Sequence, residues 1–149
     1  EVINEHIDAL HGEKVSVGMV QVRKKYEAVS EAIRKGRCRV HTYEGIEEEL
    51  LKDTFGKKGL YESTVLENTP DPMAEVDAEK LEKFLPQIAE ILDEIPSVKK
   101  LEHLLKAAGC CYRMDQIGLT EGLVLQSLRL SPYVRNRLSF NRISKMLEY

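Results

Sequence analysis

The chain has 149 residues, of which 42% are hydrophobic and 32% are charged, and its formal net charge is −3 at pH 7. This length and composition are typical of a single globular domain, and the slight acidity gives no reason to expect nucleic acid or an anionic membrane as a partner. No apolar run is long enough to insert into a membrane, and three cysteines without a disulfide framework favour a cytoplasmic location.

The first predicted helix runs from about Gly12 to Arg34 and ends before Gly36. Apolar residues recur along it in steps of three and four, which places them on one helical face. We therefore expect a buried stripe with His11 at its N-terminal end. An imidazole there is either a core histidine with satisfied nitrogens or a metal ligand. The stripe consists of His11, Val15, Met19, Val22, Tyr26, Val29 and Ile33.

The middle of the chain predicts a short acidic helix over residues 44–52, a turn over 55–59 and a linker over 68–72. Asp77 is placed to cap a longer helix, because an aspartate at that position can accept a bond from the first helical turn. Pro86 lies inside the apolar pattern of that helix, so we expect the helix to kink or restart there.

Capping residues mark the starts of the later helices. Ser97 and Thr120 each precede a helical pattern, and Ser131 is followed by a proline at the first helical position. Ser139 is expected to cap a last helix that buries Ile143, Met146 and Leu147. Because no segment shows the two-residue period of a strand, residues 1–149 are predicted to form one all-α domain of about six to eight helices.

Two groups of residues could carry chemistry. His11 cannot hold a catalytic zinc by itself, since such a site normally has three protein ligands. Arg135 and Arg137 lie in a C-terminal segment with five basic residues and one acidic residue, and they could cradle a phosphate or carboxylate. Alternatively, these arginines pair with the acidic segments 44–49 and 77–94. We found no Walker loop, strand-flanked GxGxxG or nucleophile elbow, so no nucleotide-binding fold is expected here.

The segment Leu10-His11-Gly12-Glu13-Lys14-Val15-Ser16-Val17-Gly18-Met19 resembles the HGE-x-V-x-x-G motif of the superfamily that contains 3-dehydroquinate synthase, glycerol dehydrogenase, iron-type alcohol dehydrogenases and glycerol-1-phosphate dehydrogenase. Members of that superfamily join a dinucleotide-binding domain to a helical C-terminal domain. An aspartate and two histidines hold a metal between the two domains. The resemblance implies that His11 is the last ligand of a zinc or iron ion.

The C-terminal part of the chain is similar to the tail of glycerol-1-phosphate dehydrogenases. The similarity rests on the helix and turn at 104–109, on Ile117-Gly118-Leu119-Thr120 and on residues 132–139, although Leu138 replaces the usual aromatic residue and Cys110-Cys111 replaces a small residue and a proline. It implies NAD(P)H-dependent reduction of dihydroxyacetone phosphate, a phosphorylated small-molecule substrate. By this comparison the chain is the helical C-terminal domain. The other metal ligands and the NAD(P)-binding domain would lie outside it, and the chain alone is expected to be inactive.

Roles for further residues follow from their charge and position in the sequence. Glu13 or Lys14 is a candidate to orient His11, and Arg135 and Arg137 are candidates for contacts to the substrate phosphate or to another domain. A homo-oligomer is a further expectation. Two alternatives stay open: glycerol dehydrogenase or a 3-dehydroquinate synthase-like enzyme, and a non-catalytic helical interaction module that keeps the motif as core packing.

Overall fold

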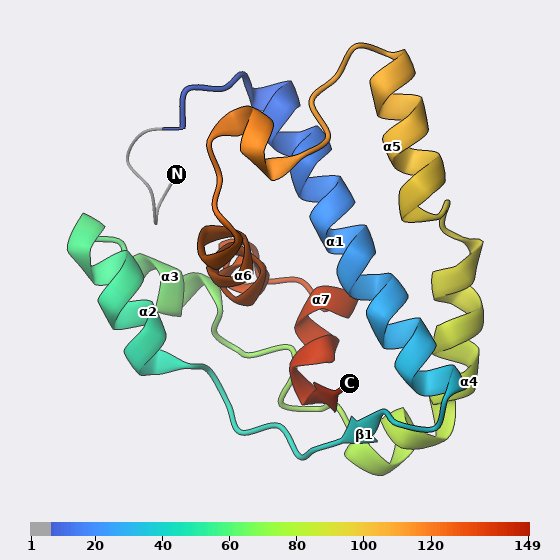
Figure 1. Ribbon diagram of the computed structural model, residues 1–149. Helices are drawn as coiled ribbons and strands as arrows, with labels where there is room; N and C mark the ends of the chain where they lie inside the picture. The colour runs from blue at the N-terminus through green and yellow to red at the C-terminus, as the bar shows by residue number, and fades with distance from the viewer. Residues whose placement is uncertain (1–6) are drawn as a thin grey trace.

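The structure is a computed structural model that describes residues 7–149, and 66% of these residues are helical. Figure 1 shows the long first helix beside α4 and α5, with α6 and α7 on its other side. This agrees with the predicted all-α class. The elements in chain order are α1 His11–Arg34, β1 Arg39–Val40, α2 Glu48–Phe55, α3 Tyr61–Glu67, α4 Ala78–Glu94, α5 Val98–Ala107, α6 Glu121–Leu130, α7 Phe140–Ile143 and β2 Leu147–Glu148, with 3₁₀ turns at Gly56–Lys58, Met114–Ile117, Ser131–Val134 and Ser144–Met146.

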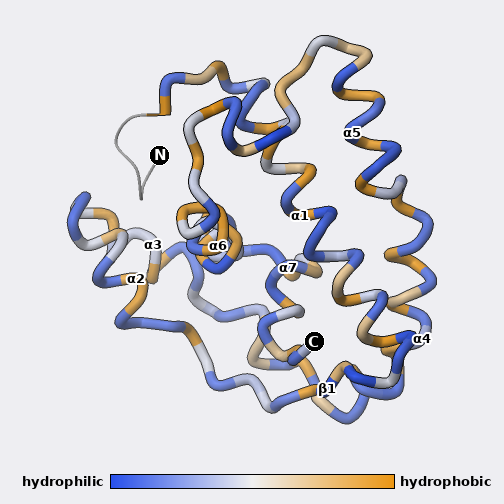
Figure 2. Tube along the Cα trace, in the orientation of Figure 1, coloured by the Kyte–Doolittle hydropathy of each residue, from blue (hydrophilic) through white to orange (hydrophobic). Residues whose placement is uncertain are grey.

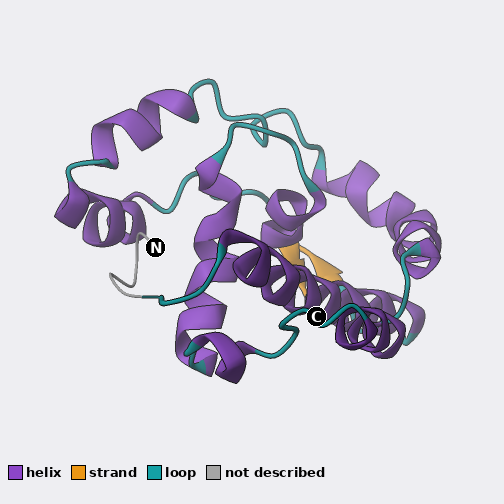
Figure 3. Ribbon diagram, turned by 90° about the horizontal axis from the view of Figure 1, so that it is seen from above, coloured by secondary structure: helices purple, strands orange, loops and turns teal. Residues whose placement is uncertain are grey.

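A short strand pair is an exception to the all-helical prediction. β1 and β2 pair in antiparallel register, with Arg39 opposite Glu148 and Val40 opposite Leu147. Figure 3 shows this pair among the surrounding helices. The prediction that Leu147 belongs to the last helix is therefore wrong, although its side chain is buried as expected. Strands of two residues carry no detectable period, because a period needs at least two repeats.

The predicted caps Asp77, Ser97 and Thr120 are confirmed. The side chain of each accepts a hydrogen bond from the backbone N–H three residues later, at 3.1, 3.3 and 3.4 Å respectively. Ser131 is not a side-chain cap, because its hydroxyl donates to the Leu128 carbonyl at 3.1 Å instead. Ser139 occupies the N-cap position of α7 without a side-chain bond.

Two helices differ from their predicted extents. α4 runs from Ala78 to Glu94 as a single helix, so the helix does not restart at Pro86. α2 begins later than predicted and continues to Phe55. Leu51 and Phe55 lie one helical turn apart and are both buried, so the packing of these two side chains extends the helix past Lys52.

The core has two parts. The larger cluster joins the C-terminal half of α1 to α4 and to the end of the chain, and the smaller one joins α2 to the end of α6. The larger cluster consists of Val29, Ala32, Cys38, Met73, Leu81, Leu85, Leu92, Met146 and Leu147, and the smaller one of Leu51, Phe55, Leu130 and Tyr133.

Arg142 on α7 lies between these clusters and is 1% exposed. Its guanidinium donates to the Pro132 carbonyl at 2.6 Å and to the Asn68 side chain, and it lies 3.6 Å from Asp71. The Tyr43 hydroxyl donates to the other oxygen of Asp71 at 2.6 Å. Burial, together with this bond to a carboxylate, raises the pKa of Tyr43. The network thus ties α7 to the segment after α3, to the turn after α6 and, through Asp71, to the segment before α2.

Hydropathy is mixed along the helices. Figure 2 shows hydrophobic and hydrophilic residues interleaved on α1, α4 and α5, the pattern of helices that bury one face. Within residues 7–149, none of the helices has the length and apolar character needed to cross a bilayer.

Candidate functional site

His11 is the first residue of α1 and is exposed. The predicted burial of its stripe is wrong in the first half of the helix, where Val15 and Met19 are 53% and 44% exposed. The buried face is shifted around the helix, and it consists of Ser16, Val17, Val20, Arg23, Val29, Ser30 and Ala32.

Polar residues explain this shift of the buried face. Ser16 donates to the Cys111 carbonyl at 2.6 Å, and Arg23 donates to the carbonyls of Pro96 and Ile95 at 2.9 and 3.1 Å. Buried polar groups are stable when they are paired in this way. Apolar periodicity does not predict the burial of Ser16 and Arg23, because serine and arginine are expected on the solvent-exposed face of a helix.

The start of α1 is held in place by Glu13. One carboxylate oxygen accepts the Leu10 backbone N–H at 2.7 Å, and the other lies 3.4 Å from the Cys111 thiol, which donates to it. Burial and the nearby carboxylate raise the pKa of the Cys111 thiol. The carboxylate of Glu13 is thus used to fix the helix start and the loop at Cys111, and no bond from it to His11 is found among the described residues.

The side chain of His11 makes no hydrogen bond or ion pair within the described part of the chain. Residues 7–149 also contain no group of three or more histidine, cysteine, aspartate or glutamate side chains that could hold a metal ion. The exposed imidazole can fill one coordination position of a zinc or iron ion. The other ligands would have to come from outside these residues.

Arg135 and Arg137 lie on the exposed segment between Val134 and α7. Arg135 forms an ion pair with Glu67 at 3.4 Å, and the Arg137 backbone N–H donates to the Arg135 carbonyl at 2.9 Å. No contact between either arginine and His11 is found in residues 7–149. The structure therefore does not bring the three predicted site residues together, and the partner of Arg135 lies on α3 rather than in either predicted acidic segment.

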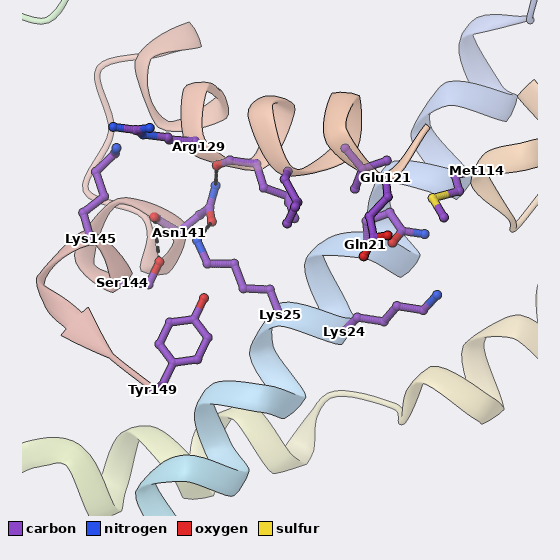
Figure 4. Close-up of a pocket in the computed structure, with 13 residues that line it drawn as sticks. Gln21, Lys24, Lys25, Met114, Glu121, Arg129, Asn141, Ser144, Lys145 and Tyr149 are labelled. Atoms are coloured by element: carbon purple, nitrogen blue, oxygen red, sulfur yellow. Dashed lines mark hydrogen bonds between the residues drawn. The ribbon is translucent and has the colours of Figure 1, made fainter. Parts of the chain in front are cut away.

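The structure contains a different basic site, which was not predicted from the sequence. A pocket of about 530 Å³ lies between α1, α6 and the C-terminal segment. We call it the basic pocket, and it is lined by Gln21, Lys24, Lys25, Met114, Glu121, Val124, Leu125, Leu128, Arg129, Asn141, Ser144, Lys145 and Tyr149. In Figure 4, Lys25, Asn141, Ser144, Lys145 and Tyr149 gather at one end, and Gln21, Glu121 and Met114 lie at the other.

Glu47, the residue before α2, forms ion pairs with both Arg129 and Lys145 at the border of this pocket. Burial alone would raise the pKa of the Glu47 carboxyl, but hydrogen bonds from Lys145 and Arg129 outweigh burial and hold this pKa below its usual range. The single carboxylate of Glu47 thus forms ion pairs with two cations. The acidic segment 44–49 does pair with part of the basic C-terminal region, as one of the two sequence alternatives proposed.

The ammonium group of Lys25 is partly buried in this pocket. Burial and the nearby Lys145 lower the pKa of its ammonium group from 10.5 to about 8. Its ammonium donates to the Asn141 side-chain oxygen. No described carboxylate lies within ion-pair distance of it. Adjacent lysines on a helix usually form a solvated face, so only the three-dimensional structure reveals this environment.

The pKa of Lys25 provides a first test of this environment. Its side chain should titrate near pH 8, and Lys145→Met should move the pKa upward, because the substitution removes the repulsion between the two ammonium groups. The pKa should stay below 10.5 in that variant, since burial is the larger cause. NMR titration of isotope-labelled lysine side chains measures this shift. Lys52→Met, on α2 and 57% exposed, is the control and should leave the pKa of Lys25 unchanged.

Comparisons with protein-family models, with curated proteins and with solved structures found no match for this chain.

Proposed function

We propose that this chain is the helical, metal-binding part of an NAD(P)-dependent oxidoreductase of the glycerol-1-phosphate dehydrogenase type, which acts in the cytoplasm on dihydroxyacetone phosphate. The observation that carries the proposal is the position of His11. It is exposed on the first turn of α1, directly before Gly12, and it lacks a described partner. An imidazole that packed in the core would be buried and hydrogen-bonded instead.

The surroundings of His11 also support a ligand role. Glu13 fixes the backbone of the first turn through Leu10, and Ser16 anchors the turn to the loop at Cys111. A ligand held on a fixed element loses less conformational entropy when it binds a metal than a ligand on a free loop. His11 would thus present its ring to an ion held jointly with residues outside 7–149.

Few of the described residues would take part directly in this reaction. When bound, the metal would supply Lewis-acid chemistry at the substrate ketone, and NAD(P)H would supply the hydride. His11 would fill one coordination position of the metal. The first turn of α1, which Glu13 and Ser16 hold in place, would orient its ring. Arg135 and Arg137 are exposed cations that could contact the substrate phosphate or another domain.

Turnover tests this function. The longest gene product that contains residues 1–149 should oxidise NAD(P)H with dihydroxyacetone phosphate, and much more slowly with dihydroxyacetone, because the phosphate contributes binding energy. The 149-residue chain alone should show no turnover. Robust turnover by this chain alone would contradict the proposal. Equal rates with both ketones would favour a glycerol dehydrogenase, and inactivity of the longer product with both would favour a helical interaction module.

A further inference from the structure

The basic pocket contains more positive than negative charge. Its lining carries Lys24, Lys25, Arg129 and Lys145 against one carboxylate, Glu121. Lys24 lies 4.0 Å from Glu102 at the edge of the pocket, and Arg129 and Lys145 share Glu47. These carboxylates leave the ammonium group of Lys25 without a counter-ion among the described residues.

Lys25 and Lys145 are brought together by the fold. Lys25 lies on α1 and donates to Asn141 on α7, while Lys145 lies one turn after Asn141 with its side chain 15% exposed. In Figure 4 both side chains reach the end of the pocket where Tyr149 lies. Two partly buried ammonium groups that repel each other are stabilised by an anion placed between them.

Another part of the pocket lining is apolar. It is formed by side chains of α6 and of the 3₁₀ turn before α6, namely Val124, Leu125, Leu128 and Met114. Val124 is buried, but Leu125 is 61% exposed. A volume of about 530 Å³ lies within the range of small-molecule sites, which combine an apolar lining with a few polar groups that fix orientation.

We propose that the basic pocket binds an amphiphilic organic anion, with its phosphate or carboxylate head between Lys25 and Lys145 and its hydrocarbon part along Leu125 and Leu128. This site is separate from the metal site of the proposed function. Lys25 lies fourteen residues after His11 on the same helix, which corresponds to about 21 Å at 1.5 Å per residue. A three-carbon substrate bound to a metal at His11 would not reach it.

Binding of n-octyl phosphate to the 149-residue chain tests this site, with inorganic phosphate and octan-1-ol as the other two probes. Isothermal titration calorimetry below the aggregation concentration of the probe should show one site per chain. We expect octyl phosphate to bind at least about tenfold more tightly than either other probe. Only octyl phosphate has both an anionic group for the two lysines and a hydrocarbon chain for the apolar side chains.

Four variants locate the site. Lys25→Met should weaken octyl phosphate binding about tenfold or more, whereas Lys25→Arg, which keeps the charge, and the exposed control Lys52→Met should not. Leu125→Asn should weaken binding of octyl phosphate but leave that of inorganic phosphate unchanged. Leu125 is exposed, so this variant should fold, and circular dichroism checks the helical content of each protein.

Several results would overturn the proposal. These are the absence of saturable octyl phosphate binding, equal affinity for octyl phosphate and octan-1-ol, or equal losses in Lys25→Met and Lys52→Met. None of them bears on the metal content of the longer gene product, so failure of this site and failure of the proposed function are distinguishable.

Discussion

Replacing Arg142 with alanine should lower the free energy of unfolding by about 3–5 kcal/mol, the usual cost of breaking a buried ion pair by removing one partner. The guanidinium is 1% exposed and pairs with Asp71, which is itself largely buried. Its removal leaves the Asp71 carboxylate without its cation, and it also leaves the Pro132 carbonyl and the Asn68 oxygen without a donor. Each such orphaned buried group costs free energy that the unfolded chain recovers from water.

Urea denaturation at pH 7 measures this loss, and a loss of this size corresponds to a fall in melting temperature on the order of 10 °C. Arg37→Ala is a matched control, because Arg37 is exposed between α1 and β1. It should change the free energy of unfolding by no more than about 0.5 kcal/mol. A loss below about 1 kcal/mol in Arg142→Ala would show that the network around Asp71 does not contribute to stability as inferred.

The sequence predicted the helices whose starts carry a local signal. Asp77, Ser97 and Thr120 are capping residues that act within a single turn, so their effect does not depend on the rest of the fold. The ends of α2 and the pairing of β1 with β2 depend on contacts between distant segments. Those contacts leave no period in the sequence, which is why Leu147 was assigned to a helix.

The candidate site was less predictable than the fold. Apolar spacing placed His11 at the end of a buried stripe, but Ser16 and Arg23 bond to backbone carbonyls, and a neighbouring face of α1 is buried in the first half of the helix instead. The basic pocket combines Lys25 with Lys145, 120 positions later in the chain. Contacts between α1 and α7, such as the bond from Lys25 to Asn141, bring these residues together.

Replacing His11 with alanine should abolish metal binding by the longest gene product that contains this chain. A catalytic zinc normally has three protein ligands, and loss of one leaves too few to hold the ion. Under the proposed function the metal would contribute several kcal/mol to stabilising the transition state, so turnover should fall about 100-fold or more. The thermal stability of the metal-free protein should change little, because the exposed side chain of His11 makes no hydrogen bond or ion pair within the described residues.

His103→Ala provides the matched control, because His103 is also exposed on a helix, α5, and lies outside the resemblance to the metal-binding motif. Metal content per chain, measured by plasma mass spectrometry after dialysis, shows whether His11 is a metal ligand. We expect about one zinc or iron per chain in the unmodified protein and in His103→Ala, and almost none in His11→Ala. Equal metal content in all three proteins would contradict the assignment of His11 as a ligand.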